Sequence, residues 1–222
     1  MSNIILFMAP GTCARVTAIA LEELHVDFEA RPVRFKIGEH KSPEYKQYNP
    51  KGKVPALVIN GQTLTENVAI LSYLNETYTG LMPIAESPID KASHLADLCF
   101  CATTLHPLVT RIRMPQMFAG PDSAYTVRDI GSKSMDEYFT LINDRLSNQL
   151  WWYGDKWSVM DAYLFWCFWR VEGAGYDISR YPNFKDHAQR MLKRPSTIRA
   201  MEREDVVEAI LKSEGLSFVP PV

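Results

Sequence analysis

Short apolar runs and helical patterns alternate over the first 80 residues. Apolar runs of four or five residues are typical of buried strands, and apolar residues three and four apart are typical of a helix face. In chain order we expect a strand, a helix, a second strand, a hairpin and a second helix, at residues 4–8, 13–24, 28–33, 56–64 and 66–78. This order predicts an α/β domain whose βαβ crossover is right-handed.

The pattern changes after a cluster of helix-breaking residues between Thr79 and Pro88. Strand signals stop there, and long helical patterns follow. We expect one helix from about residue 89 to 118, a break at Gly120-Pro121-Asp122, and another helix through residues 135–150. The prediction is therefore an α/β domain at residues 1–80, a linker at 81–88 and an all-helical domain at 89–222.

A capping pattern begins another helix of the second half. Ser158-Val159-Met160-Asp161 matches the helix N-terminal signature, with Asp in place of the usual Glu. We interpret Asp161 as a residue of the fold, not as a catalytic acid. The aromatic residues that follow are expected to lie in the core: Trp166, Phe168 and Trp169.

Composition and charge exclude several classes of protein. The chain has 24 basic and 26 acidic residues, with no basic stripe, so we expect no nucleic-acid partner. It contains no run of 18 apolar residues and no signal-peptide pattern, so neither a membrane span nor secretion is expected. Four cysteines in 222 residues do not make a disulfide framework. Reduced thiols indicate a cytoplasmic protein.

Two features near the end of the α/β domain predict a ligand site. The stretch Asn49-Pro50-Lys51-Gly52-Lys53-Val54-Pro55 precedes a short strand, and Val54-Pro55 has the context of a cis bond. A cis bond would turn the N–H and C=O of Val54 outward, where they could pair with an extended peptide. Glu66 opens a helix, whose first turn offers N–H groups to an anion. A small acidic peptide fits both features.

These features, together with Pro10-Gly11-Thr12-Cys13-Ala14-Arg15-Val16, resemble the glutathione transferase family over essentially the whole chain. The resemblance implies an α/β N-terminal thioredoxin-like domain that binds glutathione and an all-α C-terminal domain that holds the electrophile. It also implies a homodimer, with glutathione as co-substrate and no other cofactor.

The family's catalytic residue lies at the first strand or the first helix. Tyrosine-type members carry a tyrosine at the end of the first strand, where this chain has Phe7-Met8-Ala9. The resemblance instead points to Thr12 and Cys13, at the start of the first helix. Cys13 resembles the cysteine of bacterial beta-class members, which forms a mixed disulfide with glutathione, and a helix N-terminus favours thiolate. The alternative is that Cys13 is a small buried hydrophobe.

The second domain supplies further candidates by resemblance. His106 falls where beta-class members place a histidine facing the cysteine, although Pro107 stands where that class usually has lysine. A histidine on the helix surface is the alternative. Met114, Met117 and Phe118 are candidates for lining the electrophile pocket, with helical core as the equal alternative.

Glutathione's polar groups are assigned by resemblance as well. Glu66 and Asn67 would hold the γ-glutamyl end, and Val54, before Pro55, would pair with the cysteinyl backbone. Lys53 and Lys36 would face the glycine carboxylate, with solvated lysines as the alternative.

The predicted activity is glutathione transfer to an electrophile or a mixed disulfide. The alternatives are a glutathione-dependent isomerase or dehalogenase on the same scaffold, and a ligand-binding protein without turnover. A metal site is not expected, because Cys99 and Cys101 are two residues apart and cannot share one helix face.

Overall fold

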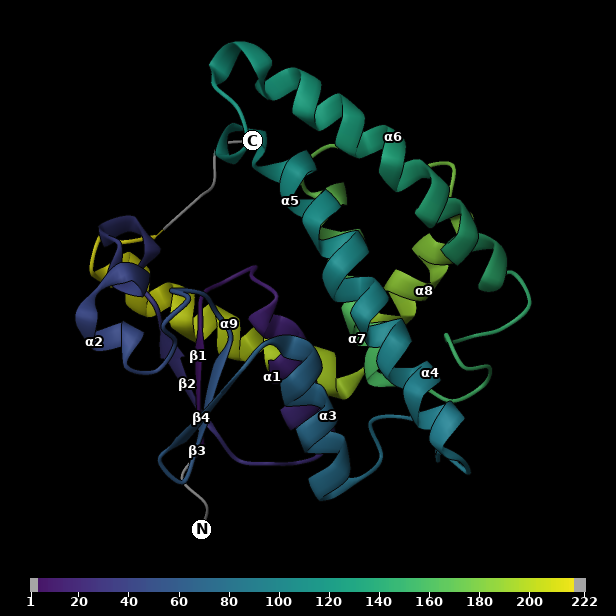
Figure 1. The fold of residues 1–222 in the computed structure, drawn as a ribbon, viewed down its shortest axis with the longest axis horizontal. Helices are drawn as coiled ribbons and strands as arrows, with labels where there is room; N and C mark the ends of the chain where they lie inside the picture. Colours follow the sequence, from purple (N-terminus) through teal and green to yellow (C-terminus); the bar gives the residue numbers. More distant parts are fainter. Residues whose placement is uncertain (1–3, 218–222) are drawn as a thin grey trace. The chain divides into compact units, whose positions relative to one another are not determined.

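A mixed four-stranded sheet forms the centre of the first of two compact units (Figure 1). The computed structural model describes residues 4–217. Within them the sheet order is β2-β1-β3-β4, with β2 parallel to β1 and the other neighbours antiparallel. The strands are β1 (Ile4–Met8), β2 (Glu29–Pro32), β3 (Ala56–Ile59) and β4 (Gln62–Thr65). The expected α/β domain is confirmed, with shifts of one or two residues at element ends.

Both faces of this sheet are covered. Successive side chains of a strand point to opposite faces. Ile5 and Phe7 therefore share one face, where they cluster with Tyr45 of α2 (Pro43–Lys46). The opposite face carries Leu6 and Met8, which are fully buried. The remaining helices of this part of the unit are α1 (Ala14–Glu23), α3 (Asn67–Tyr78) and two short 3-10 turns, η1 (Phe35–Ile37) and η2 (Glu39–Lys41). Because both faces are buried, β1 is apolar at every position.

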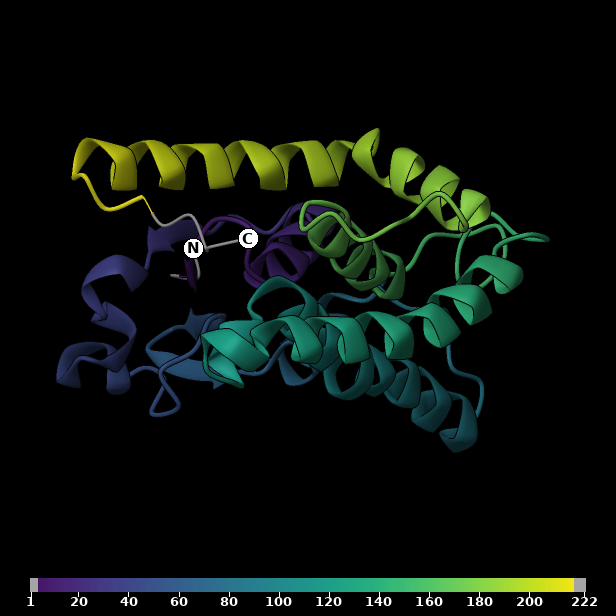
Figure 2. The same ribbon diagram turned by 90° about the horizontal axis from the view of Figure 1, so that it is seen from above.

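The last helix, α9 (Pro195–Ser213), belongs to the first unit. It packs along α1 and also contacts β2, and Figure 2 shows it in yellow above α1. Buried Glu22 of α1 accepts hydrogen bonds from Arg199 and Arg203 of α9. The sequence had assigned this helix to the all-helical domain. The structure groups α9 with the first unit because its partners, α1 and β2, lie far away in the sequence. Local periodicity predicts a helix but not its distant packing partners.

The second unit is all-helical in the described residues. It contains α4 (Pro88–Cys99), η3 (Phe100–Leu105), α5 (His106–Arg113), η4 (Pro115–Met117), α6 (Pro121–Arg145), α7 (Val159–Glu172) and α8 (Pro182–Leu192). Helix α7 is apolar nearly all round and forms the core, as a buried helix should. Of the expected core aromatics, Trp166 and Phe168 are buried and Trp169 is partly buried.

The single helix expected from about residue 89 to 118 is interrupted. Between α4 and α5 lies a π-helical segment, in which the N–H of His106 bonds to the C=O of Cys101, five residues earlier. Pro107 explains it, because proline has no N–H to donate and its ring pushes away the carbonyl four residues before it. A widened turn relieves this conflict. The helix then ends at Arg113, because Pro115 cannot continue it.

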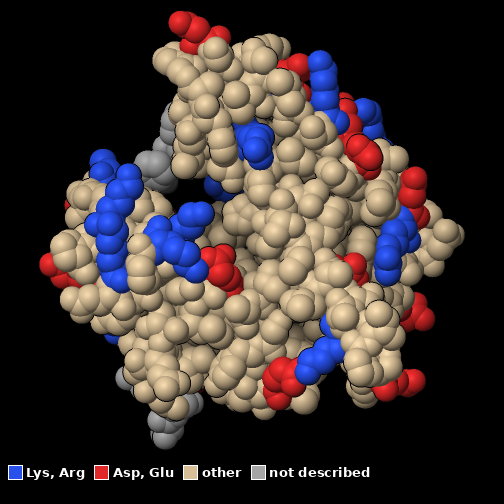
Figure 3. Space-filling model, viewed as in Figure 1, with Lys and Arg blue, Asp and Glu red and all other residues tan. Residues whose placement is uncertain are grey.

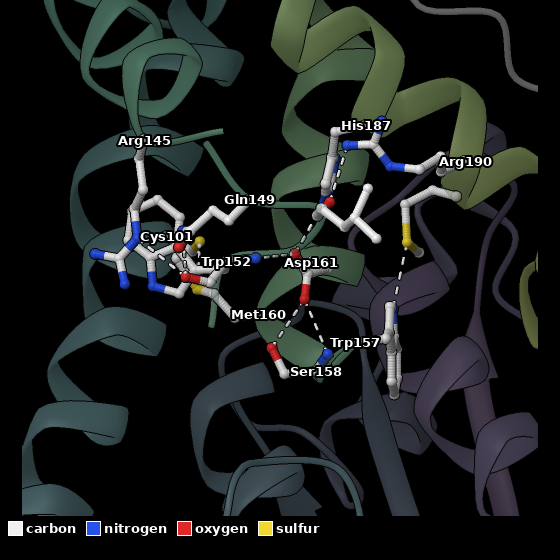
Figure 4. Close-up of polar contacts among 12 residues, drawn as sticks. Cys101, Arg145, Gln149, Trp152, Trp157, Ser158, Met160, Asp161, His187 and Arg190 are labelled. Atoms are coloured by element: carbon white, nitrogen blue, oxygen red, sulfur yellow. Dashed lines mark hydrogen bonds and ion pairs between the residues drawn. The ribbon is translucent and has the colours of Figure 1, made fainter. Parts of the chain in front are cut away.

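The capping box predicted at α7 is confirmed. Asp161 is fully buried, and its carboxylate accepts from Ser158 N at 2.9 Å and Ser158 Oγ at 3.0 Å. It also accepts from Trp152 N at 2.7 Å and lies 3.0 Å from His187 Nε2 of α8 (Figure 4). One carboxylate thus joins the start of α7, the preceding loop and α8.

Within residues 4–217, no helix has the length and apolar character that crossing a membrane requires. The same residues contain no group of three or more histidine, cysteine or acidic side chains arranged to hold a metal ion. The four cysteines are free thiols. On the face seen in Figure 3, basic side chains gather over the end of the first unit near α2, with an acidic side chain beside them.

Candidate active site

Cys13 lies at the N-terminal cap of α1, in a short loop that leaves β1. Its thiol is partly exposed and lies 3.5 Å from the carbonyl oxygen of Val54, to which it donates. Thr12 donates its hydroxyl proton to the carbonyl of Ala9 at 2.6 Å. The Thr12 proton is therefore used within the loop, and it would have to change partner to support a glutathione thiolate. Cys13 is the better placed of the two for chemistry.

A buried carboxylate holds the loop that presents Cys13. Glu204 of α9 accepts from the Gly11 N–H at 3.2 Å and takes two hydrogen bonds from Arg15, at 2.9 Å and 2.5 Å. Arg15 and Glu204 are both almost completely buried. Gly11 has φ +70°, a conformation that glycine adopts without steric cost. This forked ion pair links the residue before Thr12 to the first turn of α1, and so restricts where the Cys13 thiol can lie.

The Val54-Pro55 bond is cis, as the sequence predicted. Pro55 is buried and Val54 is partly exposed. The preceding carbonyl, that of Lys53, accepts from the Tyr45 hydroxyl at 2.7 Å and from Asn49 Nδ2 at 2.6 Å. Burial raises the pKa of Tyr45, which keeps this donor protonated. The hydrogen bonds from Tyr45 and Asn49 thus hold the loop before β3 in place.

Glu66 and Asn67 begin α3 but have different roles. Glu66 is exposed and has φ +71°. Asn67 is buried, and its amide donates to the Cys13 carbonyl at 2.9 Å and accepts from the Thr17 hydroxyl at 2.8 Å. Its side chain therefore joins α3 to α1, so a direct part in ligand binding would fall to its backbone N–H. The first-turn N–H groups of a helix have no intrahelical acceptor.

The two lysines assigned to the glycine carboxylate are both exposed. Lys36 donates to the carbonyl of Gly215 at 2.9 Å, at the end of α9. Lys53 lies directly before Val54, and its backbone carbonyl accepts from Tyr45 and Asn49. Of the two, Lys53 is the one whose backbone belongs to the loop that carries Val54.

The other candidates lie in the second unit. His106, the first residue of α5, has its Nδ1 atom 3.2 Å from the hydroxyl of buried Tyr163. The edge of its ring meets Trp166 with a centroid separation of 4.5 Å. A histidine with a buried hydroxyl partner on one nitrogen has a defined orientation, which a simple surface histidine lacks.

Met114, Met117 and Phe118 lie at and after the end of α5. Met117 and Phe118 are 63% and 48% exposed, and Met114 is partly exposed. The interpretation of Met117 and Phe118 as helical core is therefore wrong. The guanidinium of Arg111 lies 5.1 Å from the centre of the Phe118 ring.

Sequence reasoning missed four residues that organise these sites: Asn49, Lys51, Tyr163 and Glu204. Asn49 and Lys51 lie within residues 49–55, the stretch that predicts the ligand site. Asparagine between a tyrosine and a proline is a usable turn signal. Tyr163 and Glu204 meet their partners only through long-range packing. No spacing in the sequence indicates them.

Two domain families match this chain. The profile of the glutathione S-transferase N-terminal domain matches residues 2–76, and that of the C-terminal domain matches residues 126–190. Among curated relatives, glutathione S-transferase GstA of Escherichia coli O157:H7 is 28% identical over 90% of this chain and 98% of its own. A maleylacetoacetate isomerase of Pseudomonas aeruginosa is 25% identical over 75% of this chain and 80% of its own.

Solved structures agree with these matches. A sphingomonad glutathione S-transferase complexed with glutathione is 30% identical, covering 91% of this chain and 99% of its own, with a TM-score of 0.78. A bacterial beta-class glutathione S-transferase of Sphingomonas chungbukensis is 28% identical, covering 91% and 100%, with a TM-score of 0.78. The chain belongs to the glutathione S-transferase family.

Proposed function

We propose that this protein is a beta-like glutathione transferase, which binds glutathione and directs its thiolate to an electrophile or a mixed disulfide. The observation that carries the proposal is the position of Cys13, at the start of α1 and 3.5 Å from the Val54 carbonyl. A thiol there lies at the positive end of a helix, beside the backbone groups that would receive a peptide. A similar sphingomonad protein was solved in complex with glutathione.

The thiol-transfer step balances without a further reagent. The Cys13 thiolate attacks the glutathione sulfur of a mixed disulfide, forming a Cys13–glutathione disulfide and releasing the other sulfur as thiolate. A second glutathione thiolate then attacks the glutathione sulfur of that adduct. Glutathione disulfide leaves, and the Cys13 thiolate is restored. Glutathione is a co-substrate here, and the step uses no resident cofactor.

Intact mass after incubation with glutathione disulfide tests this proposal. We expect one dithiothreitol-sensitive glutathione adduct per chain in the wild type and none in Cys13→Ala. Cys99→Ala is the matched control, because Cys99 is the other partly exposed thiol. It should still form the adduct. Full disulfide-reductase activity in Cys13→Ala would move the nucleophile elsewhere.

For conjugation, we propose that the electrophile contacts Met114, Met117 and Phe118 and that His106 supports turnover. Exposed apolar side chains at the end of α5 fit a hydrophobic co-substrate. Detoxification of small electrophiles is the corresponding physiological role. Aryl halides, mixed disulfides and a maleyl keto acid, assayed side by side, separate conjugation from reduction and isomerisation. The isomerase alternative has specific support from the relatives named maleylacetoacetate isomerase.

We further propose a cytoplasmic homodimer. Four free thiols suit a reducing compartment. Ile89 and Leu95 of α4 are 75% and 46% exposed, and a subunit interface over α4 would cover them. Light scattering coupled to size exclusion should give twice the chain mass of 25.3 kDa.

A further inference from the structure

The amine of Lys51 lies beside the proposed γ-glutamyl site. Lys51 Nζ is 2.5 Å from Glu66 Oε1 and donates to the Thr65 hydroxyl at 2.9 Å. The two charged side chains are 47% and 63% exposed. A cation and an anion thus stand next to each other, open to solvent, at the N-terminus of α3.

The loop that carries Lys51 is built to hold it there. The Lys51 N–H donates to Asn49 Oδ1 at 3.1 Å, and the amide of the same buried Asn49 donates to the Lys53 carbonyl at 2.6 Å. Gly52 has φ +63°, and a Cβ at that position would lie 2.7 Å from the backbone oxygen of His40. No other residue fits there without moving backbone. The position of the Lys51 backbone is therefore determined by its hydrogen bond to Asn49 and by the close approach of Gly52 to the His40 backbone.

Folding stability does not account for this arrangement. Ion pairs between side chains this exposed contribute little to stability, because water screens them and ordering two long side chains has an entropic cost. The segment from residue 34 to 53 also has six basic and two acidic residues, whereas the whole chain has a net charge of −2. Local charge here favours an anionic ligand.

We propose that Lys51 is a further specificity-determining residue of the γ-glutamyl site, where it pairs with the α-carboxylate beside Glu66, the residue assigned to this end by resemblance. This free amino-acid end carries one ammonium and one carboxylate. Glu66 accepts from the ammonium. Lys51 binds the α-carboxylate, which also faces the first-turn N–H groups of α3. The Lys51–Glu66 ion pair is complementary in charge to this zwitterionic end of the ligand. On binding, each side chain would exchange its contact with the other for a contact with the ligand group of opposite charge. This inference rests on the proposed glutathione binding and assigns specificity within it.

Two glutathione analogues separate the charges of the ligand. In the first, 4-aminobutanoyl-cysteinylglycine, the α-carboxylate is missing. In the second, glutaryl-cysteinylglycine, the ammonium is missing. Calorimetric affinities for both and for glutathione are measured with wild type, Lys51→Met, Glu66→Gln and the charge-matched control Lys46→Met, an exposed lysine of α2. The ratio of glutathione affinity to analogue affinity reports each charge separately.

In the wild type, loss of either ligand charge should weaken binding about tenfold or more. In Lys51→Met, the ratio of glutathione affinity to the affinity of 4-aminobutanoyl-cysteinylglycine should fall at least fivefold. The corresponding ratio for glutaryl-cysteinylglycine should stay within twofold of the wild-type value. Glu66→Gln should do the reverse, and Lys46→Met should change neither.

Ratios unchanged by Lys51→Met, or tighter glutathione binding by that variant, would overturn the inference. The second result would mean that Lys51 only competes with the ligand for Glu66. In both cases glutathione binding by the wild type would leave the proposed function intact. Failure of the wild type to bind glutathione would instead overturn the proposed function, and this inference with it.

Discussion

Replacing Asp161 by alanine should destabilise the protein much more than removal of an ordinary helix cap does. Loss of a cap costs about 0.5–2 kcal/mol, which is all that the sequence pattern predicts. In the structure the same carboxylate also accepts from the Trp152 N–H and meets His187. Leaving a buried donor without its acceptor costs about 1–3 kcal/mol. With the backbone N–H groups of Trp152 and Ser158 both affected, we expect a loss of about 4 kcal/mol.

Thermal and urea unfolding measure this loss. For a chain of this size, about 4 kcal/mol corresponds to a fall in Tm of about 8–16 °C. Asp161→Asn keeps one acceptor oxygen and should fall between alanine and wild type. The matched control is Asp129→Ala on α6, whose carboxylate is 45% exposed and pairs with Lys133 in the same helix. It should cost less than about 0.5 kcal/mol.

Activity per folded molecule distinguishes a structural Asp161 from a catalytic one. The variants should retain the turnover of the wild type at a temperature where they are folded. A stable Asp161→Ala protein that has lost turnover would refute the structural interpretation. A loss of stability below about 1 kcal/mol would refute the reasoning from buried donors.

Two further predictions test other contacts. Desolvation raises the pKa of Glu22, but hydrogen bonds from Arg199 and Arg203 outweigh it, so the folded pKa lies below the ordinary 4.5. The ionised Glu22 and its two arginines therefore stabilise the protein above pH 4.5, and this effect is lost as the pH falls through the folded pKa. Thermal unfolding should show that the difference in Tm between wild type and Glu22→Gln disappears only below that pH. A difference in Tm that does not depend on pH would contradict this. Tyr163→Phe removes the partner of His106 Nδ1 and should lower kcat about threefold to tenfold without changing glutathione affinity. In a His106→Ala background, steady-state kinetics should show no further loss.

Local chemistry made much of the fold predictable from the sequence. Proline, glycine and hydroxyl caps act within a few residues, which is why the break at Gly120-Pro121, the capping box at Ser158 and the cis bond at Pro55 were all predictable. The same locality makes an interruption at Pro107 predictable, and the structure shows that it takes the form of a π segment. The strands β1 and β3 were found because central strands covered on both faces require continuous apolar runs, and β2 was found from its alternating pattern.

The sequence by itself therefore determined the order of elements, the family and the position of Cys13 at a helix start. Only the tertiary structure decided what surrounds that cysteine. Glu204 reaches the Cys13 loop from α9, 189 residues after Arg15, and the side chain of Asn67 joins α3 to α1. Such contacts arise from the packing of whole elements, which depends on all their buried surfaces together. No short window of sequence contains that information.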